Sequence, residues 1–264
     1  MHQDGYLMRP LGHTGFTAGR LGISGGYGAS TEAVELAFEK GVNYFYHGSI
    51  RRDAMTQAIK NLTARGQREK IFVVAQIYWR MFRWPVIRSF DSFLKKTGLD
   101  YVDGLLLGWH NSNPSQRLLD ICRELKEKKL TRFIGISGHN RKAFPEFAKT
   151  GLYDFFHTRY NAVHRGGETE IFPLLPSENR PGVVVYTATS WSQLLNPRKT
   201  PPSEKTPAGS DCYRFVISNP SVDVCITGPK NMHETKEALR ALELGPMTED
   251  ELDWMRRVGD YIHR

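Results

Sequence analysis

The sequence predicts an α/β protein of the (β/α)8 barrel class, in which parallel strands alternate with helices. Short β-branched runs alternate with amphipathic stretches about eight times over about 250 residues, which is the size and rhythm of such a barrel. Several runs, among them GVVVY, DGLLLGW and VDVCIT, are apolar at successive positions. Strands that helices cover on the outside are buried on both faces, so this pattern favours a parallel sheet.

The expected strands are rich in β-branched, aliphatic and aromatic residues, which favour extended structure. In chain order they are Leu21–Ser24, Asn43–Tyr46, Phe72–Ile77, Val102–Leu107, Phe133–Ser137, Phe155–Tyr160, Val183–Thr187 and Val222–Thr227.

Amphipathic patterns between these strands predict helices over 31–41, 51–62, 86–98, 115–130 and 232–242. Gly41, Gly98 and Gly151 each stand where a helix should end in a left-handed residue. The pattern is weakest over 160–181, so we expect a short sixth crossover there.

Two segments fall outside the repeat, and a third ends the chain. Residues 8–22 read as a turn-rich hairpin that could plug the bottom of the barrel. Residues 196–211 are rich in Pro, Lys and Ser and are expected to form a loop over the barrel mouth. The last segment begins at a Thr248 cap and predicts a terminal helix. No composition shift marks a boundary, so we expect residues 1–264 to form a single barrel domain.

A doubly wound open sheet would also alternate strands and helices, but it calls for G-x-G-x-x-G after the first strand. The segment SGGYGAS at 24–30 is rich in glycine without matching that pattern. We therefore interpret it as a tight turn near the barrel mouth.

Composition excludes several other classes of protein. Among the 264 residues, 40% are hydrophobic and 24% charged, as in an ordinary globular chain. The net charge of +8 is spread over expected helix surfaces, and we expect neither nucleic acid nor a membrane as a partner. No secretory signal is apparent, and three widely separated cysteines suit neither disulfides nor a zinc ribbon, so a cytoplasmic location is expected. The oligomeric state stays open.

Polar and aromatic residues gather where the expected strands end, which is the functional face of this fold. Five of the nine histidines follow expected strands: His47, His110, His139, His157 and His164. Because histidine titrates and binds metals near neutral pH, such a cluster favours a functional site.

The same segments, taken in order, resemble the aldo-keto reductase superfamily. PLGHTGFTAGRLGIS is similar to its LGxTGxxVSxLGLG start, and AFEKGVNYFYHGS to its AxxxGxNxFDTAxxYG motif. REKIFVVAQI, LDYVDGLLLGWHN, IGISGHN, RYNAVH and ITGPKNMHETKEALRAL resemble later motifs of the family in the same order. The resemblance implies hydride transfer between NADPH and a carbonyl, with a tyrosine as the proton donor.

All four catalytic positions of that family carry other residues here. The aspartate position holds Tyr46, the tyrosine position Arg51, the lysine position Gln76 and the histidine position Gly108. A rewired site is one hypothesis, with the Tyr46 phenol as donor and His47, Arg51, Gln76 and His110 around it. A wall tyrosine with no catalytic role is the alternative for Tyr46.

The resemblance retains more of the cofactor side. It places Tyr186 against the nicotinamide, Ser137 at the carboxamide, and His157 where the family has a glutamine. Thr187 follows Tyr186, and Gly228, Lys230 and Glu237 stand in the adenosine-phosphate segment. NADP(H) is therefore the expected cofactor.

Two other functions stay open at this point. A barrel without catalysis could bind a small molecule or a protein partner, which the four replacements favour. A metal-dependent hydrolase would use His110, His139 and His157, but the first and last strands lack the usual ligands of such enzymes, and no metal site is expected.

Overall fold

The protein is described by a computed structural model that covers residues 6–48, 52–77 and 83–263. Eight parallel strands close into a barrel in the order β10-β3-β4-β5-β6-β7-β8-β9. Their bounds are β3 Leu21–Ser24, β4 Tyr44–Tyr46, β5 Phe72–Ile77, β6 Val102–Leu107, β7 Thr131–Ser137, β8 Phe155–Arg159, β9 Gly182–Tyr186 and β10 Val224–Thr227. The predicted barrel is confirmed, and because the sheet closes, the doubly wound alternative is wrong.

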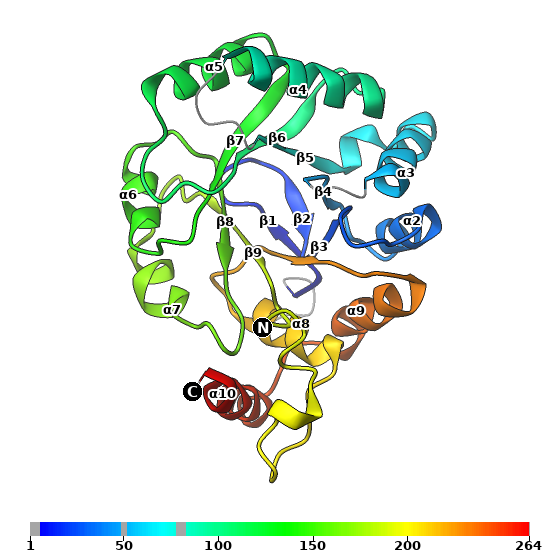
Figure 1. The fold of residues 1–264 in the computed structure, drawn as a ribbon, viewed down its shortest axis with the longest axis vertical. Coiled ribbons are helices and arrows are strands. Elements are labelled where there is room, and N and C mark those ends of the chain that lie inside the picture. The colour runs from blue at the N-terminus through cyan, green and yellow to red at the C-terminus, as the bar shows by residue number, and fades with distance from the viewer. Residues whose placement is uncertain (1–5, 49–51, 78–82, 264) are drawn as a thin grey trace.

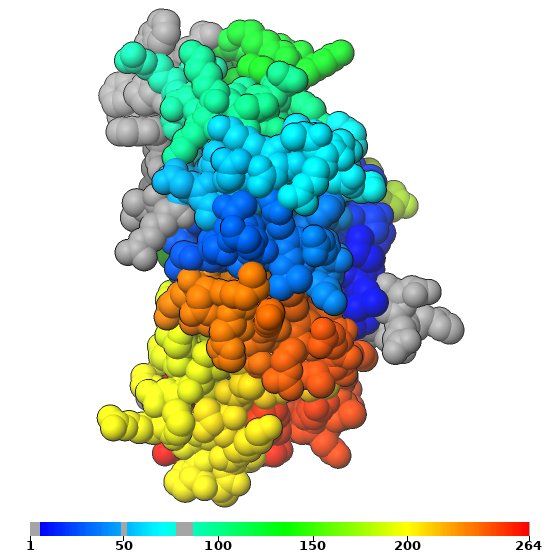
Figure 2. Space-filling model, turned by 90° about the vertical axis from the view of Figure 1, so that its right-hand side faces the viewer, coloured from blue at the N-terminus to red at the C-terminus, as the bar shows by residue number. Residues whose placement is uncertain are grey.

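Helices surround the barrel as an outer ring (Figure 1). They are α2 Thr31–Glu39, α3 Asp53–Ala64, α4 Arg83–Thr97, α5 Gln116–Glu127, α6 Ala143–Lys149, α7 Gly167–Glu170, α8 Gly209–Ser218, α9 Met232–Leu244 and α10 Glu249–His263, with short 3-10 turns at Arg68–Lys70, Phe172–Leu174 and Pro197–Lys199. Figure 2 shows part of the ring from outside, where α3 in cyan, α2 in blue and α9 in orange lie side by side.

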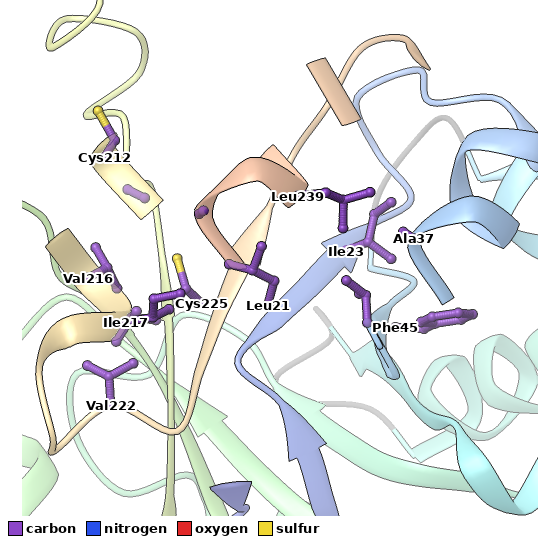
Figure 3. Packing of buried hydrophobic residues seen from close by; sticks show 14 of the residues in the cluster. Leu21, Ile23, Ala37, Phe45, Cys212, Val216, Ile217, Val222, Cys225 and Leu239 are labelled. Carbon is purple, nitrogen blue, oxygen red and sulfur yellow. The ribbon is translucent and has the colours of Figure 1, made fainter. Parts of the chain in front are cut away.

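Apolar residues pack in separate layers inside and outside the barrel wall. Tyr44, Phe72 and Phe155 lie inside the barrel with Val184 and Val224. The alternate strand residues face the helices instead, and the largest cluster joins strand residues such as Leu21, Ile23 and Phe45 to helix residues such as Ala37 and Leu239 (Figure 3). This alternation fixes which side chains at the strand ends point toward the barrel axis.

The amino-terminal hairpin closes the bottom of the barrel, as predicted. β1 (Met8–Pro10) pairs antiparallel with β2 (Thr17–Gly19), and Figure 1 shows both within the ring of strands. Leu11 is fully buried in the interior cluster, and the Phe16 ring lies 5.2 Å from that of Phe72. The hairpin therefore fills the end of the barrel interior that lies opposite the carboxyl ends of the strands.

Three buried or half-buried aspartates at the bottom of the barrel accept hydrogen bonds from backbone N–H groups of the strands. Asp103 accepts from Val73 N at 2.9 Å, Asp154 from Ile134 N at 2.8 Å and Asp223 from Val183 N at 2.8 Å. Arginines pair with two of these carboxylates, as Arg68 does with Asp103 at 2.8 Å and Arg180 with Asp223 at 2.6 Å. These three aspartates are therefore engaged in contacts that stabilise the fold.

Several expectations about the connections are confirmed. The sixth crossover is short, since α7 has four residues and a 3-10 turn follows it. Gly41, Gly98 and Gly151 have φ values of 91°, 70° and 64°, so each ends its helix in the left-handed region.

The expectation for residues 196–211 is wrong in two respects. α8 already begins at Gly209, with Asp211 accepting from Ala208 N at 2.9 Å. The rest of the segment does not cover the mouth but reaches α10, where Trp254 Nε1 donates to Lys205 O at 3.1 Å and Arg257 pairs with Glu204 at 2.6 Å. Contacts with a helix far along the chain decided its course, and composition carries no trace of them. α6 is the helix that Gly151 was expected to end, although the sequence pattern did not give its range.

Within the described ranges, we find no helix with both the length and the apolar character needed to cross a membrane.

Candidate functional site

A pocket of about 660 Å³ opens at the carboxyl ends of the barrel strands. This volume lies within the range of small-molecule and cofactor sites. Each of the eight strands contributes a residue at or near its end: Ser24, Tyr46, Gln76, Leu106, Ser137, His157, Tyr186 and Thr227. The loop after β9 and the first residues of α8 and α9 extend the wall on one side.

Tyr46 and Gln76 form a pair at the floor of the pocket. The Tyr46 hydroxyl donates to Gln76 Oε1. A side chain at Gly108 would collide with the Gln76 amide, and one at Gly48 would collide with the Tyr46 ring. The two glycines therefore give Tyr46 and Gln76 the space that they occupy.

Behind this pair lies a buried tyrosine–histidine contact. Tyr44 Oη is 2.8 Å from His157 Nε2, and the His157 ring lies 5.4 Å from the Tyr46 ring. Burial lowers the pKa of His157 to about 3, so its imidazole is neutral at pH 7. Burial also raises the pKa of Tyr44 well above its ordinary value. This part of the wall therefore carries no charge.

Tyr186 and Ser137 end β9 and β7, the two strands on either side of β8. Tyr186 lines the pocket, and burial raises its pKa to about 12, so it stays a neutral phenol. Ser137 Oγ accepts from Trp109 N at 3.2 Å and also lines the pocket. The pocket thus offers an aromatic ring and a hydroxyl to a flat, polar ligand.

The far end of the pocket is formed by the starts of two helices. Lys230 lies just before α9, where its own N–H donates to Glu234 at 2.9 Å. Glu237 accepts from Ser210 N and Oγ at the start of α8, at 3.1 and 2.7 Å, and pairs with Arg240 at 3.0 Å. Since Arg240 compensates Glu237, the Lys230 ammonium remains the cation that can attract a phosphate among these residues.

The loop after β9 has an unusual backbone. Thr187, Ser190, Trp191 and Ser192 all have φ between 49° and 67°. Asn161 Nδ2 donates to Thr187 O at 2.7 Å and holds the first of these residues. Side chains without glycine's freedom rarely adopt this conformation, and such strain clusters at functional sites.

All seven residues predicted to bind the cofactor line this one pocket: Ser137, His157, Tyr186, Thr187, Gly228, Lys230 and Glu237. Of the five predicted catalytic residues, Tyr46 and Gln76 line it as well. Arg51 lies outside the described residues.

The structure does not bring His47 and His110 into the pocket lining. His47 Nε2 contacts Thr56 Oγ1 at 2.8 Å, and its ring packs edge-on against Phe93 in the helix layer. Burial lowers the pKa of His47 to about 4, so it carries no positive charge at pH 7. His110 is buried beside β7, where its N–H donates to Ser137 O at 2.7 Å.

Several lining residues were not singled out from the sequence. The Ser24 hydroxyl is buried and has no hydrogen-bond partner among the described residues, so it is available to a polar ligand. Tyr27, Trp109 and Trp191 line the pocket and are 53%, 60% and 59% exposed. Tyr27 lies within SGGYGAS, the segment interpreted as a turn near the mouth, and a side chain at Gly228 would lie 2.7 Å from its ring. No local pattern marks Trp191.

The histidines considered as metal ligands do not converge. His139 is exposed at the rim, whereas His157 is bound to Tyr44 inside the barrel. In the described part of the chain, no group of three or more His, Cys, Asp or Glu residues could hold a metal ion.

Comparison with known proteins points to one fold. No family model matches the sequence. An aldo-keto reductase from Bacillus halodurans in its holo form superposes with a TM-score of 0.77 at 19% identity, over 95% of both chains. An aldo/keto reductase from Klebsiella pneumoniae in complex with NADP and acetate gives a TM-score of 0.75 at 17% identity, over 92% of both chains.

A sequence match to a curated protein is more limited. The NADH-specific methylglyoxal reductase of Escherichia coli strain K12 is 23% identical over 124 residues, which are 46% of this chain. The match spans 37% of that protein's length. The closed barrel, its hairpin plug and the superpositions agree, and this chain therefore has the (β/α)8 fold of the aldo-keto reductases.

Proposed function

We propose that this chain is an NADP(H)-dependent oxidoreductase of the aldo-keto reductase type, which acts on a carbonyl or alcohol with non-standard catalytic residues. The observation that carries the proposal is the convergence of all seven expected cofactor residues, with Tyr46 and Gln76, on one pocket. The bound NADP in the Klebsiella pneumoniae relative supports the choice of cofactor.

The residues present fit a nicotinamide dinucleotide phosphate. Tyr186 would stack on the nicotinamide, and Ser137 would bind its carboxamide through the hydroxyl group. The partnerless Ser24 hydroxyl offers one more polar contact inside the pocket. Lys230 before α9 would attract the adenosine phosphate, and Gly228 leaves room there for Tyr27.

When bound, the reduced cofactor supplies a hydride to the carbonyl carbon. The chain must then protonate the oxygen, and Tyr46 carries an inward-facing O–H that lines the pocket. To do so, the Tyr46 hydroxyl would break its hydrogen bond to Gln76 and donate its proton to the substrate oxygen, which leaves a phenolate. Gln76 is neutral, so it does not stabilise a phenolate as a cation would, and we expect slow turnover.

Binding without catalysis is the second candidate. It is favoured because the Tyr46 hydroxyl already donates a hydrogen bond to Gln76. In that case the pocket would bind the nucleotide or a small molecule, and Tyr46 would be part of the wall.

Titration of the purified protein with NADPH tests the proposal first. We expect NADPH to quench tryptophan fluorescence, because Trp109 and Trp191 line the pocket. Tyr186→Ala and Lys230→Glu should each weaken binding about tenfold or more, given the worth of a charge-assisted contact or a stacked ring. Lys236→Glu, on the exposed face of α9, is the matched control and should leave binding unchanged.

Turnover separates the two candidates. We expect slow NADPH oxidation with an aromatic aldehyde, and its loss in Tyr46→Phe without loss of NADPH binding. Binding without turnover would support the second candidate. No quenching at millimolar NADPH would overturn both nicotinamide readings.

We also propose that the protein works in the cytoplasm. Cys122, Cys212 and Cys225 are buried, free thiols, which suits a reducing compartment.

A further inference from the structure

Arg159 is the last residue of β8 and follows the pocket residue His157 on the inner face of that strand, although it is not among the residues that line the pocket. Along this strand Phe155 packs inside the barrel, His157 lines the pocket, and Arg159 comes two residues later on the same side. Arg159 is also the register partner of Tyr186, which lines the pocket on the neighbouring strand. Its side chain is therefore carried by a rigid element at the mouth.

Among the described residues, no carboxylate lies within salt-bridge distance of the Arg159 guanidinium. The acids that follow β8 are engaged elsewhere: Tyr160 Oη donates to Glu168 at 2.5 Å, and Arg141 pairs with Glu170. Arg165 holds Asp260 at 2.7 Å. A half-buried guanidinium without a counter-ion favours an external anion.

Trp191 supplies a flat apolar surface next to this charge. The Arg159 guanidinium lies 5.6 Å from the centroid of the Trp191 ring. The His164 ring packs edge-on against Trp191 at 6.2 Å and contacts His263 at 5.7 Å. Trp191 is 59% exposed and has a left-handed backbone, with φ of 53°.

We propose that Arg159 and Trp191 form an anion subsite at the pocket rim, which binds a carboxylate carried by a planar apolar group. The guanidinium holds the carboxylate through paired hydrogen bonds, and the indole covers the ring or chain that carries it. Binding of such a carboxylate does not depend on the proposed function. The inference that the substrate is a carbonyl compound bearing a carboxylate rests on that function.

The spacing limits the size of that substrate. Residues of one strand that share a face lie about 7 Å apart, so Arg159 is about that far above His157. The His157 ring lies 5.4 Å from that of Tyr46, the expected donor. An aromatic aldehyde with its carboxylate across the ring has about the required span.

Calorimetry with benzoate and benzamide, without any nucleotide, tests the subsite directly. These probes share shape and differ in charge. We expect benzoate to bind at least about tenfold more tightly than benzamide, a preference that weakens with added salt. Arg159→Met should abolish the preference, and Arg159→Lys should keep part of it because the charge remains. Trp191→Leu should weaken the binding of both probes.

Arg123→Met is the matched control, since Arg123 is half-exposed on the outer face of α5 and pairs with Asp120. It should leave the preference unchanged. Equal or undetectable binding of the two probes by the wild type, or an unchanged preference in a folded Arg159→Met, would overturn the subsite.

A second experiment distinguishes failure of the subsite proposal from failure of the proposed function. We would measure NADPH-dependent turnover of 4-carboxybenzaldehyde and of its 4-carboxamide. A benzoate preference without turnover of either aldehyde means that the subsite stands and the oxidoreductase proposal fails. Turnover with equal kcat/KM for both, together with equal probe binding, means the reverse.

Discussion

At the scale of single residues, two glycines and two larger side chains of the pocket fit one another. Gly108 leaves room for the Gln76 amide, and Gly48 leaves room for the Tyr46 ring. The hydrogen bond between Tyr46 and Gln76 joins the two halves of this arrangement. A larger side chain at Gly108 or Gly48 alone would displace Gln76 or Tyr46.

A double-mutant cycle on Gly108 and Gln76 tests this coupling. Gly108→Ala places a methyl group where the Gln76 amide lies, so we expect a loss of about 1–3 kcal/mol from overpacking. In the Gln76→Ala background the same change should cost less, with a coupling energy of about 0.5–3 kcal/mol. Urea unfolding measures both. Additive losses would show that the residues do not share the space.

At the scale of elements, the strands decide the direction of their side chains by simple alternation. Tyr44 and Tyr46 face the barrel axis, whereas Phe45 and His47 face the helix layer. Alternation thus explains why His47 lies outside the pocket although it adjoins Tyr46 in sequence. Arg159 faces the mouth for the same reason.

The hairpin plug makes a testable contribution to stability. Leu11 is fully buried between the hairpin and the barrel strands, so Leu11→Ala should destabilise the protein by about 2–5 kcal/mol. Leu174→Ala, at a position 58% exposed after α7, is the control and should change the urea midpoint little. If the two substitutions cost the same, the hairpin does not act as a packed plug.

At the scale of the whole molecule, two buried neutral histidines make stability depend on pH. Burial lowers the pKa of His157 to about 3 and that of His47 to about 4, against about 6.5 in an unfolded chain. Below pH 6.5 the unfolded state therefore binds protons that the folded state does not, and the free energy of unfolding falls as the pH falls.

We expect each histidine to remove about 2 kcal/mol between pH 7 and pH 5. Urea unfolding at pH 7, 6 and 5 measures the loss, and His47→Gln should reduce it by about half. Burial raises the pKa of Asp103, which acts in the opposite direction at lower pH, so the comparison stops at pH 5. A midpoint that stays constant from pH 7 to 5 would contradict the histidine assignment.

The sequence by itself determined the barrel, most strand bounds and the inward positions at the strand ends, because alternation and apolar runs are local properties. β3, β5 and β6 have the predicted bounds, and the seven expected cofactor residues share one pocket. Only the tertiary structure decided the fit of Gln76 over Gly108, the path of residues 196–208 to α10, and the contact between Arg159 and Trp191. Each of these depends on atoms from separate elements competing for the same space, and no short pattern along the chain encodes that.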